Sequence, residues 1–328
     1  MSDFIQTTQV TEAKQALDRL RESMRASIKG KDDVIEQVII CLLGGGHLLI
    51  EDLPGVGKTT LAYALARSMD CTFSRVQFTS DLLPGDVTGV AIYDETIKEF
   101  VFKKGPVFAN VVLADEINRA TPKTQSALLE AMQERTVTAA GKSMELPKPF
   151  FVLATQNPIE MEGTYRLPEA QIDRFLFKSE VQYPGEDDLH GILDLTTGAD
   201  IPVPKQVLSA DDILTLQKLV RQVPVASHVT RAIARFAIST QPKPGVQNDI
   251  TKYFRFGISP RGAQSLMLAS KGHALLSGRY NVGFEDLRAI LAPTLRHRCT
   301  LNYEGEAEGI NPDQVLNRLL DEQTRKAA

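Results

Sequence analysis

In the first part of the chain, segments with the apolar spacing of a helix alternate with short runs typical of β-strands. Helical spacing places Leu17, Leu20 and Met24 on one face of residues 11–28, and a second helical pattern covers residues 31–43. Five runs of β-forming residues follow, mostly separated by helical patterns, at positions 48–50, 73–78, 111–114, 150–154 and 175–181. Strands that alternate with helices are typical of βαβ units. The pattern predicts an α/β fold whose parallel sheet is covered by helices on both faces.

Two segments alternate apolar and polar residues without fitting a βαβ unit. The first, residues 87–107, surrounds Asp94 and Glu95, and the second, residues 135–149, contains a turn at Gly141. Such alternation on both sides of a short turn is the pattern of an antiparallel hairpin. We therefore expect two hairpins to be inserted into the α/β fold.

The pattern becomes mainly helical in the last third of the chain. Pro202 and Pro204 favour a linker, and Ser209 is a suitable N-cap for a helix that begins at Ala210. Further helical patterns cover residues 229–240, 261–276 and 284–297. The sequence predicts an α/β domain over residues 1–185, a linker over 186–208 and an α-helical domain over 209–328.

Composition narrows the class of protein. Apolar residues make up 43% of the 328 positions and charged residues 24%, which is ordinary for a soluble globular chain. A net charge of −4 argues against general binding of nucleic acid. The longest apolar stretch, residues 38–43, is too short to span a bilayer, and the polar N-terminus does not resemble a signal peptide. Three scattered cysteines predict reduced, buried thiols and a cytoplasmic location, and five dispersed histidines argue against a zinc site.

A glycine loop between a predicted strand and a predicted helix is the strongest chemical motif. Residues 47–60 read HLLIEDLPGVGKTT. Gly55 and Gly57 allow the backbone N–H groups to point at an anion, and the following helix adds the positive end of its dipole. We expect Lys58 to reach the β- and γ-phosphates of a nucleoside triphosphate, and the Thr59 hydroxyl to hold Mg²⁺.

Polar residues follow two of the other predicted strands. Asp115 and Glu116 end the third strand, and Asn157 comes directly after the fourth. The carboxyl ends of parallel strands lie at one edge of the sheet, where such folds bind ligands. We expect Asp115 to hold Mg²⁺ opposite Thr59, Glu116 to act as general base on a water molecule, and Asn157 to orient that water.

Three arginines stand near these elements. Arg174 ends a short helical segment before the fifth strand, which is a position from which it can point into a neighbouring copy and stabilise charge on a transferred phosphoryl group. Arg261 opens a helix of the second domain, and we expect it to fold back on the γ-phosphate. Arg119 follows the acidic pair and is a candidate for a subunit boundary.

Taken together, these motifs resemble the AAA+ ATPases of the MoxR type. The resemblance covers residues 15–320 approximately, and its most specific part is the run at 154–158 followed by residues 167–175. It implies a P-loop NTPase core with five strands in the order 5-1-4-3-2, and a C-terminal all-α lid domain. Asp52 stands where the general Walker A pattern has glycine, and this group tolerates other residues there.

The resemblance also assigns roles. Asp115 and Glu116 form Walker B, Asn157 is sensor 1, Arg174 is the arginine finger and Arg261 is sensor 2. The implied ATP contacts are Ile28 and Gly30 at the adenine pocket, followed by Pro54, Gly55, Val56, Gly57, Lys58, Thr59 and Thr60 in the Walker A loop. The cofactors implied are ATP and Mg²⁺. The metal ligands implied are Thr59 and Asp115.

The family resemblance further implies a hexameric ring that hydrolyses ATP and acts as a chaperone in the assembly, maturation or metal insertion of a protein client. A partner with a von Willebrand A domain is also implied. Two alternatives stay open from the sequence. One is a nucleic-acid motor with the same inserted hairpins, and the other is a scaffold that binds nucleotide without turnover. The acidic net charge argues against the first, and Glu116 with the two arginines argues against the second.

Overall fold

The centre of the molecule is a parallel five-strand sheet. A computed structural model describes residues 6–51, 57–139, 141–157, 164–181, 183–198 and 202–325. The strands are β1 (Leu48–Glu51), β2 (Phe73–Gln77), β5 (Val111–Asp115), β8 (Phe151–Gln156) and β9 (Phe177–Glu180). They lie in the order β2-β5-β8-β1-β9, and all four pairings are parallel. Counted along the chain this is the order 5-1-4-3-2, so the predicted fold class is confirmed.

Alternate residues of each strand enter two separate hydrophobic cores. Leu48 and Ile50 pack into one core, whereas Leu49 packs into the other, and β5 and β8 alternate in the same way. The first core is covered by α1 (Thr7–Arg25), α2 (Asp32–Leu43) and α3 (Lys58–Ser68), and the second by α4 (Pro84–Thr88) and α5 (Pro122–Glu134). Strands buried on both faces explain why the β5 and β8 sequences are apolar throughout.

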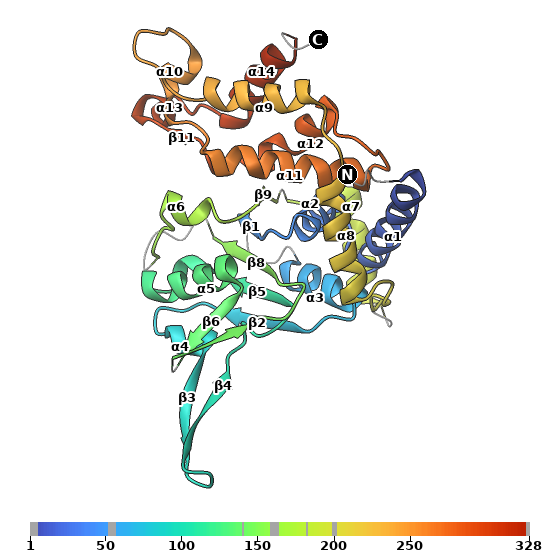
Figure 1. Ribbon diagram of the computed structural model, residues 1–328, viewed down its shortest axis with the longest axis vertical. Coiled ribbons are helices and arrows are strands. Elements are labelled where there is room, and N and C mark those ends of the chain that lie inside the picture. The colour runs from blue at the N-terminus through green and yellow to red at the C-terminus, as the bar shows by residue number, and fades with distance from the viewer. Residues whose placement is uncertain are drawn as a thin grey trace.

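Both predicted hairpins are present. The first consists of β3 (Gly89–Asp94) and β4 (Glu99–Lys104), and the second of β6 (Thr136–Ala139) and β7 (Lys142–Glu145). Val87 lies in α4 instead of the first hairpin, so that hairpin begins later than predicted. Figure 1 shows β3 and β4 projecting from the body of the molecule. Apolar side chains of this hairpin are exposed, among them Ile92, Tyr93, Phe100 and Val101.

Residues 210–325 form a mainly helical domain, as expected. Its helices are α8 (Ala210–Gln222), α9 (Ser227–Ser239), α10 (Asp249–Tyr253), α11 (Pro260–Leu276), α12 (Phe284–Leu295), α13 (Tyr303–Ala307) and α14 (Pro312–Arg325). A two-strand pair, β10 (Phe254–Phe256) with β11 (Thr300–Leu301), joins them. Ser209 caps α8 as predicted, because its Oγ accepts a hydrogen bond from the Asp212 backbone at 3.2 Å. Among the described residues, no helix combines the length and apolar character needed to cross a bilayer.

The stretch predicted as a linker contains a helix. The helix α7 (Glu186–Thr197) occupies most of its first half, and the sequence analysis did not predict this helix. The helical domain packs onto the sheet at its β9 edge, and its apolar residues belong to the same core as those of α1, α2 and β1. Figure 1 shows α11 and α12 lying over α2 and β9. The position of the helical domain on the sheet is therefore fixed by a continuous hydrophobic core.

The buried His47, directly before β1, forms hydrogen bonds with β8 and α5. His47 Nδ1 accepts a hydrogen bond from the Val152 backbone at 3.0 Å, so its Nε2 carries the proton that is donated to the Met132 carbonyl oxygen at 3.2 Å. Burial, together with the charge of Arg135, lowers the pKa of His47 from 6.5 to about 3. The folded protein therefore holds this imidazole in its neutral form at neutral pH.

We expect this histidine to make the protein less stable in acid. Its pKa is lower in the folded than in the unfolded state, so its contribution is complete above pH 6.5 and is lost as the pH falls toward 3. At pH 5 the loss is on the order of 2 kcal/mol of unfolding free energy. Urea unfolding at pH 7.5 and at pH 5 measures it. His47→Gln, which retains a donor and an acceptor but does not titrate, should flatten this dependence; an equal slope in both proteins would contradict the assignment.

Candidate functional site

The start of α3 has the geometry expected of an anion site. Gly57 precedes the helix with φ of +86°, a left-handed conformation that favours glycine. Among the described residues, no atom lies within 4 Å of the place that a Cβ atom on Gly57 would take, so the space next to Gly57 is open. Lys58, Thr59 and Thr60 form that turn, and their N–H groups have no helical acceptor. The predicted loop residues Asp52, Pro54, Gly55 and Val56 lie outside the described residues.

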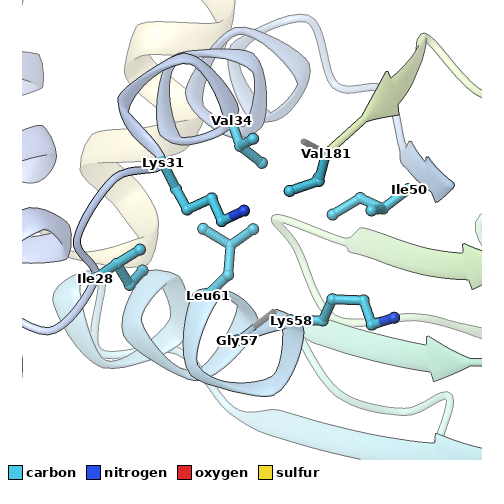
Figure 2. Close-up of a pocket in the computed structure, with 8 residues that line it drawn as sticks. All are labelled: Ile28, Lys31, Val34, Ile50, Gly57, Lys58, Leu61 and Val181. Carbon is cyan, nitrogen blue, oxygen red and sulfur yellow. The ribbon is translucent and has the colours of Figure 1, made fainter. Parts of the chain in front are cut away.

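Lys58 points away from the small apolar pocket next to it. Figure 2 shows its side chain leaving the start of α3 in a direction opposite to Ile28, whereas Lys31 and Leu61 point into the pocket. Contact of the Lys58 ammonium group with bound phosphates stays a prediction.

A larger cavity of about 340 Å³ adjoins Gly57 and Thr60. Ile28, the residue predicted at the adenine pocket, lines it, and Tyr183 with the apolar residues Leu189 and Ile192 forms another part of its wall. The mostly apolar lining and the aromatic ring suit a planar heterocycle. The helix α7, which the sequence analysis took for linker, supplies Leu189 and Ile192 and was therefore missed as part of the site.

Gly30 borders the same region for a steric reason. Its φ is +66°, and a Cβ atom there would lie 2.5 Å from the Asp188 side chain in α7. Any larger residue would strain the backbone and push α7 away. Gly30 therefore both separates α1 from α2 and permits the close approach of the helix that lines the cavity.

The Asp115 carboxylate is buried at the carboxyl end of β5. Its Oδ1 accepts a hydrogen bond from Thr155 Oγ1 at 2.8 Å, and its Oδ2 pairs with Arg75 Nη2 at 2.7 Å. The Thr155 oxygen in turn accepts a hydrogen bond from the Glu116 backbone N–H at 2.8 Å. These bonds fix both acids relative to β8.

Glu116 has an unusual backbone and a polar partner on the next strand. Its φ is +55°, a left-handed conformation that costs a non-glycine residue on the order of 1 kcal/mol and that clusters at functional sites. The Gln77 Nε2 group donates to Glu116 Oε2 at 2.7 Å, and Arg119 Nη1 lies 3.2 Å from the same oxygen. Gln77 therefore holds the carboxylate of the predicted general base in one orientation.

Arg75 and Gln77 are site residues that sequence reasoning missed. They are two positions apart on β2, so their side chains share one face of the sheet, and β2 pairs with β5 so that Gln77 lies beside Asp115. The sequence signal for them is a pair of polar residues, two positions apart, on a strand that pairs with the strand ending in Asp115.

Asn157 follows β8 at the same edge of the sheet as the two acids. It is 8% exposed, and its backbone oxygen accepts a hydrogen bond from Asn118 Nδ2 at 3.3 Å. Asn118 is itself buried, and its backbone oxygen accepts from the Tyr165 N–H at 2.7 Å. The structure thus brings Asn157 to the edge where the sequence places it.

Arg174 and Arg261 lie elsewhere, at the opposite end of the sheet. Arg174 comes just after α6 (Glu169–Ile172) and before β9, and the nearby Leu176 N–H donates to the His47 oxygen in front of β1. Arg261, in the first turn of α11, lies close to Arg298, whose guanidinium contacts this same segment. Burial and, to a smaller extent, the charge of Arg261 lower the pKa of Arg298.

This placement corrects one expectation. The amino ends of β1 and β9 are at the edge opposite to Lys58, Asp115 and Glu116, because the sheet is parallel. Arg261 is therefore not folded back over the phosphate site of its own chain. Arg174 is half-buried and Arg261 is exposed, so both arginines reach the surface on this side. A second molecule that contacts this side can therefore reach both arginines.

The residues at the acidic edge fit a magnesium nucleotide. Carboxylate and hydroxyl oxygens are the ligands that Mg²⁺ prefers, and the pairing of Asp115 with Arg75 Nη2 at 2.7 Å indicates that this buried carboxylate is charged and takes a cationic partner. In the described part of the chain, the open space next to Gly57 and the mostly apolar cavity beside it suit phosphates and a base, respectively. Thr59 and Asp115 would hold the metal.

The chain is similar to known proteins along nearly all of its length. Residues 47–177 match the family described as "ATPase family associated with various cellular activities (AAA)", and residues 247–319 match the AAA lid domain. The Bacillus subtilis protein YeaC is 43% identical over 93% of either chain. The chaperone MoxR1 of Mycobacterium tuberculosis is also 43% identical, over 93% of this chain and 81% of its own. A crystal structure from Cytophaga hutchinsonii, of a protein assigned as an ATPase, superimposes with a TM-score of 0.89 at 36% identity and covers 95% of each chain.

Proposed function

Because this chain belongs to the MoxR family of AAA+ ATPases, we propose that it hydrolyses ATP at sites completed by an adjacent copy of itself. The observation that carries the proposal is the separation of two groups of residues. Lys58, Asp115 and Glu116 lie at the carboxyl edge of the sheet, and Arg174 and Arg261 lie at its amino edge. Arg75 and Arg119 also stand at the carboxyl edge, but they are paired with Asp115 and Glu116, whereas Arg174 and Arg261 pair with neither acid in the described structure.

A head-to-tail arrangement of copies brings these two edges together. Such a heterologous contact uses two different surfaces of the same chain, and it closes into a ring when the rotation between copies allows it. The family resemblance favours six copies. In this ring Arg174 and Arg261 of one copy would face the phosphates bound to the next.

The chain's own residues have distinct tasks in the reaction. The cavity beside Ile28 and Tyr183 binds the base, and the first turn of α3 with Lys58 holds the phosphates. Mg²⁺, when bound, neutralises phosphate charge next to Thr59 and Asp115. Glu116 takes the proton of the attacking water on a carboxylate oxygen, and Asn157 orients that water. The arginines of the adjacent copy stabilise the negative charge that develops on the transferred group.

We propose that hydrolysis serves the remodelling of a protein client in the cytoplasm. The 43% identity to a protein named as a chaperone supports this assignment. The β3–β4 hairpin also supports it, because Ile92, Phe100 and Val101 are exposed on a segment that stands away from the body. Exposed apolar side chains favour contact with a polypeptide over contact with nucleic acid. Assembly, maturation or metal insertion of the client, and a partner with a von Willebrand A domain, stay part of this proposal.

The phosphate site can be tested by removing its lysine. Lys58→Ala should weaken binding of ATP and ADP by roughly 10–100-fold, since a charge-assisted contact to phosphate is worth about 1.5–3 kcal/mol. Calorimetric titration with each nucleotide measures this. Lys142→Ala, on the exposed strand β7, is the matched control and should bind like the unmodified protein. Equal affinities of the two variants would exclude the proposed site.

A further inference from the structure

Asp173 connects the segment that carries Arg174 to the helix that carries Arg261. Its Oδ1 accepts a hydrogen bond from Arg298 Nε at 2.6 Å, and its Oδ2 accepts one from Ser259 Oγ at 3.3 Å. Ser259 is the N-cap of α11, where its Oγ also accepts from the Gly262 N–H at 3.1 Å. A single carboxylate is thus bonded to the N-cap of α11 and to the turn that follows α12.

Arg298 holds the backbone on both sides of Arg174. Its Nη2 donates to the carbonyl oxygens of Asp173 at 3.1 Å and Phe175 at 2.6 Å, and its Nη1 donates to that of Leu176 at 3.0 Å. The Arg298 side chain is 2% exposed, so these bonds are shielded from water. The neighbouring His297 donates from Nε2 to the Phe175 oxygen at 3.2 Å. Residues 173–176 are therefore held by side chains of the helical domain.

The segments that carry Arg174 and Arg261 are consequently both bonded to the Asp173 carboxylate or lie next to it. Arg174 is the residue after Asp173, and Arg261 is two residues after Ser259, which binds the same carboxylate. The Arg174 guanidinium has its own contact on the sheet side, where Nη1 donates to the Leu129 oxygen at 2.8 Å. Buried ionic clusters with this many satisfied bonds are rigid, because moving one member leaves the others unpaired.

We propose that Asp173 is a positioning residue, which fixes Arg174 and Arg261 as one unit so that both enter the site of the adjacent copy together. This inference rests on the proposed function, since it concerns arginines that act on a second copy. Asp173 itself touches no nucleotide and takes no part in proton transfer. It determines the positions of the Arg174 and Arg261 side chains.

Removing this carboxylate should slow hydrolysis without weakening nucleotide binding. We expect Asp173→Ala to lower kcat by roughly 10²-fold, the effect of a displacement of about 1 Å at a reacting centre. ATP affinity of the same variant should be unchanged, because its own phosphate site lies at the other edge of the sheet. Asp173→Asn, which keeps the size of the side chain, should show the same split if Asp173→Ala folds poorly.

Asp313→Ala is the matched control. Asp313 binds Arg296 at 2.7 Å, and its side chain is 22% exposed, against 21% for Asp173. Its loss removes a comparable ion pair from the helical domain without touching residues 173–176. This variant should retain the kcat of the unmodified protein. If both carboxylate variants lose activity equally, the effect is one of general stability and the inference is overturned.

Mixed oligomers provide a readout that a merely structural role would not change. Lys58→Ala copies should bind nucleotide roughly 10–100-fold more weakly, so they stay largely empty at low ATP concentration, but they carry an intact Asp173 and both arginines. When they are mixed with Asp173→Ala copies and isolated by two different affinity tags, hydrolysis per Asp173→Ala copy should rise at least tenfold over the pure variant. No rise would overturn the inference, because it would place the defect within the variant's own site.

The activities of the pure Arg174→Ala and Asp173→Ala variants separate this inference from the proposed function. If Arg174→Ala itself hydrolyses ATP like the unmodified protein, the composite site is wrong and the role of Asp173 falls with it. If Arg174→Ala is inactive but Asp173→Ala is fully active, the composite site stands and only the positioning role fails. In the double variant Asp173→Ala/Arg174→Ala, the combined loss should be smaller than the product of the two single losses, since part of the Asp173→Ala defect acts through Arg174.

Discussion

Glu116→Gln should stop hydrolysis while ATP remains bound. The amide has the shape of the carboxylate and can still accept the hydrogen bond from Gln77 Nε2, which is 2.7 Å from Glu116 Oε2. It cannot take a proton from water. General base catalysis contributes about 10²–10⁴-fold, so kcat should fall by that factor. The nucleotide contacts at Lys58 and in the cavity beside Ile28 are unchanged.

Two measurements on this variant decide the role of Glu116. Steady-state release of phosphate gives kcat, and titration with fluorescent ATP gives the affinity. Glu145→Gln, a carboxylate with 75% of its side chain exposed on β7, is the control and should keep full activity. If Glu116→Gln still hydrolyses ATP at the normal rate, another group is the general base and the role proposed for Glu116 is wrong.

The main-chain architecture follows from local sequence pattern to a large extent. The sequences of β5 and β8 consist mainly of apolar residues. This pattern is typical of strands that are covered on both faces of the sheet. The order of the strands came instead from the family resemblance, because apolar periodicity does not determine which strands are neighbours. The helix α7 was missed although Leu189, Ile192 and Leu193 have helical spacing, because the prolines that follow it favoured a linker over the whole stretch.

The candidate site was predictable only where its residues follow strand ends. Asp115, Glu116 and Asn157 each end or follow a strand, and a parallel sheet gathers such positions at one edge. Arg75 and Gln77 lie within a strand, and their approach to the acids depends on the register between β2 and β5. That register is set by tertiary packing, which a single sequence does not reveal.

The location of Arg174 could have been derived from topology alone. A residue just before a parallel strand lies at the amino edge of the sheet, whereas the loop after β1 lies at the carboxyl edge. Arg261 is different, because its place depends on how the helical domain is seated. Only the structure shows Ser259 and Arg298 bonded to Asp173, which puts Arg261 on the same side as Arg174.

Arg174→Ala should give the largest loss of activity. An arginine that stabilises the transferred phosphoryl group from a second molecule is worth roughly 10³–10⁵ in rate, so kcat should fall by that factor. Nucleotide affinity of the variant should stay normal, because Arg174 is remote from the phosphate site of its own chain. Arg174→Lys keeps the charge but loses the planar fork of donors, and only a small part of the activity should return.

The dependence on protein concentration makes the test specific to a composite site. If Arg174 acts on the next copy, the turnover per chain of the unmodified protein should rise with concentration until the oligomer is complete, whereas Arg174→Ala should assemble over the same range and stay inactive. Light scattering at each concentration checks the assembly. A dilute protein that is monomeric and fully active would contradict the model, because a single chain keeps its acids and its two arginines at opposite edges of the sheet. Assembly would then serve the client and not the chemistry.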